Sequence, residues 1–207
     1  MWRRKLDPAV AASVTERIRS VESSSSAEVV VEVRARSGSY SHADARLAAM
    51  VAFIALLIVL FSPWTFEPIW VPPVVLAAYI TGVMLSRVSA TIGRAMTTRR
   101  DRDARVRTTA AAAFVERGVG NTSRETGLFI FLSLLERRME LIADRGVLDA
   151  VPVLAWNQVL EKTRHRKADT EVLLDVLREI EPLLTRYLPV QADDKDELSN
   201  EVHFVSG

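Results

Sequence analysis

The sequence of 207 residues contains no cysteine. This absence excludes disulfides, thiolate metal sites and a cysteine nucleophile. An excess of one charge is also missing, because the formal net charge is only +1, and we expect no nucleic-acid partner. Nucleophile elbows, Walker loops, dinucleotide fingerprints and zinc-binding helix motifs are absent as well. The sequence therefore offers no ready-made catalytic set.

Two long segments lack any charged residue. The first, residues 47–66, reads LAAMVAFIALLIVLFSPWTF, and the second, residues 68–86, reads PIWVPPVVLAAYITGVMLS. The one residue between them is Glu67. A helix needs about 20 apolar residues to cross a membrane. The pattern predicts a transmembrane hairpin over 43–90, with spans at about 45–63 and 69–88. Two alternatives are a buried helical pair in a soluble protein, and one span plus an interfacial segment disturbed by Pro72 and Pro73.

Basic residues indicate the orientation of this hairpin. The connecting loop carries only Glu67, whereas arginines flank both spans on the other side. The positive-inside rule then predicts a two-pass protein of the cell (inner) membrane of a bacterium, with both termini cytoplasmic and the lipid bilayer as a partner. The predicted membrane-interface residues are Trp64, Trp70, Arg87 and Arg94. The arginines after the second span either contact anionic lipid headgroups or form a solvated helix face.

Alternating and helical patterns flank the hairpin. They predict a helix over 8–22, a strand in AEVVVEVRAR, a helix over 98–117, strands in TGLFIFLSL and MELIAD, and helices over 148–164 and 169–188. The fold class is therefore α/β, with a small three- to four-stranded mixed sheet flanked by helices and interrupted by the transmembrane hairpin.

The order of these elements predicts how the domain assembles. Its first part is 8–40 and its second part 95–188, followed by an acidic tail over 189–207 in which VHFV could add an edge strand. The first two strands are joined through helices and should be parallel, while the second and third form a β-hairpin. Both parts must meet in one sheet, so the chain must cross the membrane an even number of times.

The segment GLFIFLSLLERRMELIADRG resembles the central hairpin of the TPM-domain family. Gly127, Glu136, Arg137, Arg138 and Gly146 occupy the glycine-led strand, the acidic-basic turn and the closing glycine of that pattern. The resemblance covers roughly 8–36 and 97–165. It implies a small α/β/α sandwich that is usually tethered to a membrane. It also implies phosphatase-like or accessory roles, with metal binding in some members.

Several polar residues are candidates for a site. Asp144 and Asp149, around the turn after the third strand, could hold a hard cation such as Ca²⁺. Alternatively, Asp149 caps the next helix and Asp144 pairs with an arginine. Arg137 and Arg138 could bind an anion or be solvated turn residues. We expect Asp101 and Asp103 to pair with arginines along their own helix, and His42, His165 and His203 to be ordinary surface or interfacial residues.

Two functions fit these patterns. The first is a non-catalytic interaction or accessory module for membrane-protein assembly or maintenance, with other membrane proteins as partners. The second is a metal-dependent, phosphatase-like hydrolase at the membrane surface. A third and weaker hypothesis, an oligomeric membrane sensor, has only the isolated Gly82 and no GxxxG pattern behind it.

Overall fold

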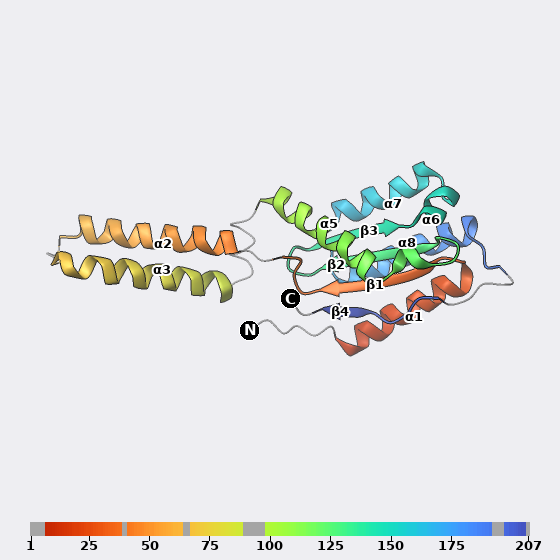
Figure 1. Ribbon diagram of the computed structural model, residues 1–207, viewed down its shortest axis with the longest axis horizontal. Helices are drawn as coiled ribbons and strands as arrows, with labels where there is room; N and C mark the ends of the chain where they lie inside the picture. The colour runs from red at the N-terminus through yellow and green to blue at the C-terminus, as the bar shows by residue number, and fades with distance from the viewer. Residues whose placement is uncertain (1–6, 39–40, 64–66, 89–97, 192–196, 206–207) are drawn as a thin grey trace. The chain divides into compact units, whose positions relative to one another are not determined.

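A computed structural model describes residues 7–38, 41–63, 67–88, 98–191 and 197–205. The chain divides into two compact units, residues 39–102 and residues 2–38 with 103–207 (Figure 1). The helices of the described residues are α1 (Pro8–Ser24), α2 (Ser41–Phe61), η1 (Pro68–Trp70), α3 (Val71–Val88), α5 (Arg99–Glu116), η2 (Val119–Asn121), α6 (Arg145–Ala150), α7 (Val153–His165) and α8 (Thr170–Tyr187). Their strands are β1 (Glu28–Arg34), β2 (Gly127–Ser133), β3 (Arg138–Ala143) and β4 (His203–Val205).

The α/β unit is built on one four-stranded mixed sheet in the order β3-β2-β1-β4. Strands β1 and β2 are parallel over seven residues, and β3 runs antiparallel to β2, which confirms both predicted pairings. Strand β4 pairs parallel with β1. The segment VHFV therefore contains the edge strand that the sequence allowed. The end of the acidic tail is therefore part of the sheet.

Helices cover both faces of this sheet (Figure 1). One face, with Val29 and Val31 of β1, packs against apolar side chains of α1, α7 and α8. The other face, with Phe129 and Phe131 of β2, packs against α5. Every residue of β2 is buried, as expected for a central strand with a continuous apolar run.

One predicted helix is in fact two. The single helix expected over 148–164 is divided into α6 and α7, with Val151 and Pro152 between them. Val151 is extended, at φ −88° and ψ 126°, because a residue before proline is disfavoured in the helical region. The chain turns there, and buried Trp156 in α7 then contributes to the core of the sheet.

The other unit, residues 39–102, contains the helix pair α2 and α3 with η1 between them. Two windows, Asp44–Phe61 and Pro68–Ser86, are long and apolar enough to cross a membrane, with mean hydropathies of 2.3 and 1.8. Only 17% and 11% of these windows is buried, whereas a core helix of a soluble protein would be mostly buried. Large apolar side chains therefore cover the outside of the helix pair, including Phe53, Leu60 and Met84.

The two helices approach most closely at small residues. A Cβ atom added to Gly82 would lie 2.6 Å from the Cα of Ala48, and Ala48 is fully buried. The Ser86 hydroxyl also donates a short hydrogen bond to the Asp44 carboxylate across the pair. Gly82, isolated in sequence, thus has a packing role between α2 and α3, as small residues do in membrane helix pairs.

Candidate functional site at the carboxyl end of the parallel strands

A buried polar network surrounds Ser37, three positions after the end of β1. Its backbone N–H donates to the Glu136 carboxylate at 3.2 Å and 3.3 Å, and its hydroxyl donates to Ser133 Oγ at 2.7 Å. Ser133 in turn donates to Glu136. From α5, Thr109 Oγ1 donates to the Ser37 carbonyl at 2.7 Å. The network joins the end of β1, the β2–β3 turn and α5 at the point where the chain leaves the sheet.

A second cluster lies on the α5 face of β1. Glu32 is fully buried, and its two carboxylate oxygens accept hydrogen bonds from Arg34 Nε at 2.5 Å and Arg117 Nε at 2.7 Å. A buried carboxylate needs such charged donors to offset its lost hydration. The cluster ties β1 to the end of α5.

Histidine 203 joins this cluster from β4. It is the register partner of Glu32 and is half-buried. Burial lowers the pKa of His203 below its usual value, the positive charge of Arg117 lowers it further, and Glu32 and Glu201 oppose this shift. The neutral imidazole is therefore favoured in the folded chain. His203 is a contact between the tail and the core.

Arg138 connects β3 to α5 and to the end of α7. Its Nε lies 2.7 Å from Asp103 Oδ1, and its Nη1 donates to the Arg164 carbonyl at 3.2 Å. Asp103, expected to pair along its own helix, thus reaches across to the sheet. Burial raises the pKa of neighbouring Glu140, against the lowering effect of nearby arginines, chiefly Arg107.

The two predicted anion-binding arginines have different environments. Arg138 is part-buried in its ion pair, while Arg137 is exposed in the turn with a left-handed φ of 52°. The Arg137 carbonyl accepts a hydrogen bond from Ala168 N at 3.2 Å. This bond fixes the segment after α7 beside the β2–β3 turn. The structure thus gives Arg138 a protein partner, and Arg137 is a surface residue.

Asp144 and Asp149, the two predicted metal ligands, have the reverse of the alternative roles expected for them, which were an arginine partner for Asp144 and a helix cap for Asp149. Asp144, not Asp149, caps α6 by accepting from Arg145 N at 2.8 Å. Asp149 is exposed and lies 3.5 Å from Arg145 Nε. Asp144 Oδ2 is buried without a hydrogen-bond partner among the described residues. The described residues contain no group of three or more His, Cys, Asp or Glu side chains that could hold a metal ion.

The direction of β3 also changes where these aspartates lie. Leu128, near the start of β2, pairs with Ala143, the last residue of antiparallel β3. Asp144 therefore follows at the amino end of the parallel strands. Ligands of α/β sheets usually bind at the opposite, carboxyl end. The rule that ligands bind at the carboxyl ends of strands holds for parallel strands, and so it does not support a site at Asp144, which follows the antiparallel strand β3.

The two glycines of the family pattern are required by close backbone approaches. A Cβ on Gly127 would lie 2.2 Å from the Val119 carbonyl oxygen, and one on Gly146 would lie 2.4 Å from the Arg124 carbonyl oxygen. Gly146 N also donates to the Glu125 carbonyl at 2.8 Å. The packing of loops around β2 is enough to explain why both positions are glycine.

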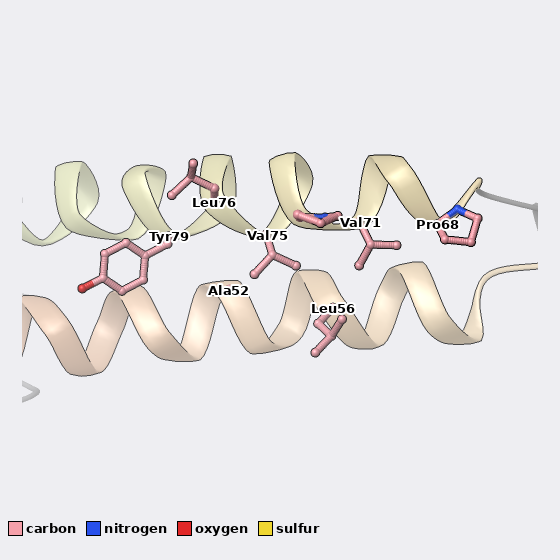
Figure 2. A pocket seen from close by; sticks show the side chains of 8 residues that line it. Ala52, Leu56, Pro68, Val71, Val75, Leu76 and Tyr79 are labelled. Carbon is pink, nitrogen blue, oxygen red and sulfur yellow. The ribbon is translucent and has the colours of Figure 1, made fainter.

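Only part of the predicted membrane interface is described. Trp70 lies in η1 and is 61% exposed, and Arg87 is in the last turn of α3. Trp64 and Arg94 lie outside the described residues. A shallow apolar groove runs between α2 and α3 (Figure 2). It is lined by Ala52, Leu56, Pro68, Val71, Pro72, Val75, Leu76 and Tyr79.

Comparisons with known proteins show the fold. No family model matches the sequence, and no curated protein matches it either. Among solved structures, the chain is similar to the NMR structure of the BA42 protein from the psychrophilic bacterium Bizionia argentinensis. The two are 14% identical, the match covers 99% of each chain, and the TM-score is 0.57. At this identity the likeness extends to the fold alone.

Proposed function

We propose that this protein is a membrane-anchored, TPM-like domain that acts as a non-catalytic accessory module for other membrane proteins. One observation carries the proposal. The apolar helix pair is inserted between β1 and α5, while β1 pairs with β2 across that insertion over seven residues. The α/β unit therefore cannot form its sheet without the two ends of the helix pair coming together. An enzyme that is only held at the membrane by an anchor at one end of its chain would not need this arrangement.

Other features support the same proposal. Apolar side chains such as Phe61 and Ile69 cover the outside of the helix pair and suit contact with lipid. Basic residues flank the pair and favour cytoplasmic termini. The TPM-like pattern from Gly127 to Gly146 adds an association with membrane tethering.

Affinity capture tests the accessory role. The tagged full chain is captured from membranes in mild detergent, and a chain limited to residues 39–98 serves as the control for contacts made by the hairpin. We expect the full chain to recover membrane proteins that the hairpin control does not. Recovery of the same set by both, or of no partner by either, would contradict the proposal.

A second function, a metal-dependent phosphatase-like hydrolase at the membrane surface, has one observation in its favour. The buried and unpartnered Oδ2 atom of Asp144 is free to accept a cation such as Ca²⁺. The test is hydrolysis of generic phosphoesters by the full chain with added divalent cations. Activity that disappears in Asp144→Ala and persists in Asp149→Ala would show that Asp144 is part of the hydrolytic site. Asp149→Ala is the matched control because Asp149 is exposed and paired with Arg145.

A further inference from the structure

We propose that the α/β unit binds the anionic headgroup surface of the membrane through a basic collar. The basic collar consists of Arg105, Arg107, Arg137, Arg164 and Lys167. Its residues come from α5, the β2–β3 turn and the end of α7, which lie far apart in sequence. The inference rests on the proposed membrane anchoring and adds a ligand class, anionic phospholipid, and the residues that bind it.

Three contacts bring these segments together. Ala168 N donates to the Arg137 carbonyl at 3.2 Å, and Arg138 Nη1 donates to the Arg164 carbonyl at 3.2 Å. These two bonds place residues 164–168 beside the β2–β3 turn. The ion pair between Arg138 and Asp103 adds the start of α5 to the same place.

The collar lies where the chain leaves the α/β unit for the hairpin. Ser37 is bonded to Glu136 in the β2–β3 turn, and a Cβ on Gly38 would lie 3.3 Å from Arg105 Nη1. Asp44, where the first apolar window begins, is six positions after Gly38. An extended residue spans about 3.5 Å, so this connection reaches no further than roughly 20 Å. The chain therefore enters the hairpin from this pole of the unit.

Acidic residues also lie at this pole, and two collar residues, Arg137 and Lys167, have no ion pair with them among the described residues. Glu136 is buried in the Ser37 network, and Asp103 is paired with Arg138. Glu140 is part-buried, and Arg107 and Arg164 of the collar lie near its carboxylate. Of the collar, Arg164 has an exposed ion pair with Glu161 at 3.5 Å, and Arg137 and Lys167 are exposed with no ion pair among the described residues. Arg137 and Lys167 therefore give this pole exposed positive charge.

Anionic lipid is the partner that this geometry favours. A basic residue near an anionic membrane surface strengthens binding roughly fivefold, and the effect decays within a Debye length. Tethering by the hairpin raises the local concentration of headgroups around the collar, so even weak sites are occupied. The arginine fork suits bidentate contacts with phosphate.

Fluorescence quenching in nanodiscs tests the collar with the full chain. Because the chain has no cysteine, Thr108→Cys gives a single label next to Arg107, and Asn121→Cys gives a control label near the start of β2. Both are exposed. The nanodiscs contain phosphatidylcholine with or without phosphatidylglycerol, plus a lipid with a quencher on its headgroup. We expect the position-108 label to be quenched more strongly when phosphatidylglycerol is present, and the position-121 label to be unaffected.

Matched variants assign the effect to the collar. Arg137→Gln, Arg164→Gln and Lys167→Gln together should reduce position-108 quenching to its level in phosphatidylcholine. Arg19→Gln, Arg145→Gln and Arg186→Gln, which remove three exposed charges from α1, α6 and α8, should leave it unchanged. Raising NaCl to about 1 M, where the Debye length is about 3 Å, should also abolish it.

The outcomes separate this inference from the proposed anchoring. Equal quenching with and without phosphatidylglycerol, or equal effects of both triple variants, would overturn the collar. Failure of the full chain to incorporate into any nanodisc would instead overturn the anchoring itself. Circular dichroism of each variant checks that its helices and strands are retained.

Discussion

The backbone N–H of Ser37 donates to the Glu136 carboxylate over 3.2 Å, although 99 positions separate the two residues. The whole hairpin lies between them in sequence. The bond therefore joins the first part of the α/β unit to the second at the place where the chain leaves for the hairpin. Both residues are buried, so the bond is protected from competition with water.

Replacing Glu136 should loosen this junction. Glu136→Ala removes the acceptor for Ser37 N–H and for the Ser133 hydroxyl, and should lower the free energy of unfolding by about 2–3 kcal/mol, because buried donors lose their partner. Hydrogen–deuterium exchange of peptides from β1 and β2 measures the loss. Glu16→Ala, on the exposed side of α1, is the control. Equal protection in both variants would show that the junction contributes nothing.

Replacing Glu32 should have a larger effect. Glu32→Ala leaves the guanidinium groups of Arg34 and Arg117 without their buried carboxylate, and breaking a buried ion pair costs about 3–5 kcal/mol. Glu116→Ala removes a carboxylate that is 69% exposed and 3.7 Å from Arg34, and should cost less than about 1 kcal/mol. Urea titration of the full chain in mild detergent measures both. Similar midpoints for the two variants would contradict the assigned role of Glu32.

Acidification should weaken the α/β unit through His203. Its pKa is lower in the folded chain than in the unfolded chain, so the unfolded state binds more protons as the pH falls below about 6.5. The stability contributed by neutral His203 is present above that pH and is lost as the pH falls through the folded pKa. His203→Gln should therefore lose less stability than the wild type between about pH 7 and pH 5. Urea midpoints with the same pH slope in both chains would refute this.

Gly82 should be indispensable to the helix pair. Gly82→Leu would force side-chain atoms into the backbone of Ala48, since even a Cβ would lie 2.6 Å from its Cα. We expect a loss of at least about 2 kcal/mol, the usual scale of overpacking, seen as a lower temperature of aggregation in detergent. Ala77→Leu, on the exposed side of α3, should be neutral. A Gly82 variant as stable as the Ala77 variant would mean that α2 and α3 pack differently.

Sequence patterns predict most of this fold because hydrophobic periodicity determines element type and buried face. The valines of β1 and the run from Gly127 to Ser133 predict both central strands. The helices that connect them predict that the two strands are parallel. The break between α6 and α7 was missed, although Pro152 marks it. The tail strand was only one option for 202–205, because three residues of β4 depend on pairing with β1 rather than on local preference.

The polar clusters were harder to predict. Glu32 reads as the polar side of an alternating strand, but α5 covers that side and makes it a buried carboxylate. Its partner Arg117 lies 85 positions away, and a single sequence gives no sign of that contact. The network of Ser37, Ser133 and Thr109 was missed for the same reason. Small hydroxyl residues carry no spacing that indicates a long-range hydrogen bond.

Cysteine accessibility tests the central claim, a two-span membrane anchor with the α/β unit on the cytoplasmic side. The cysteine-free chain allows single cysteines at Glu67, between the spans, and at Asn121, in the α/β unit. Spheroplasts are treated with a membrane-impermeant maleimide before and after permeabilisation. We expect position 67 to be labelled in intact spheroplasts and position 121 only after permeabilisation. Labelling of position 121 in intact spheroplasts, or recovery of the chain in the soluble fraction, would contradict it.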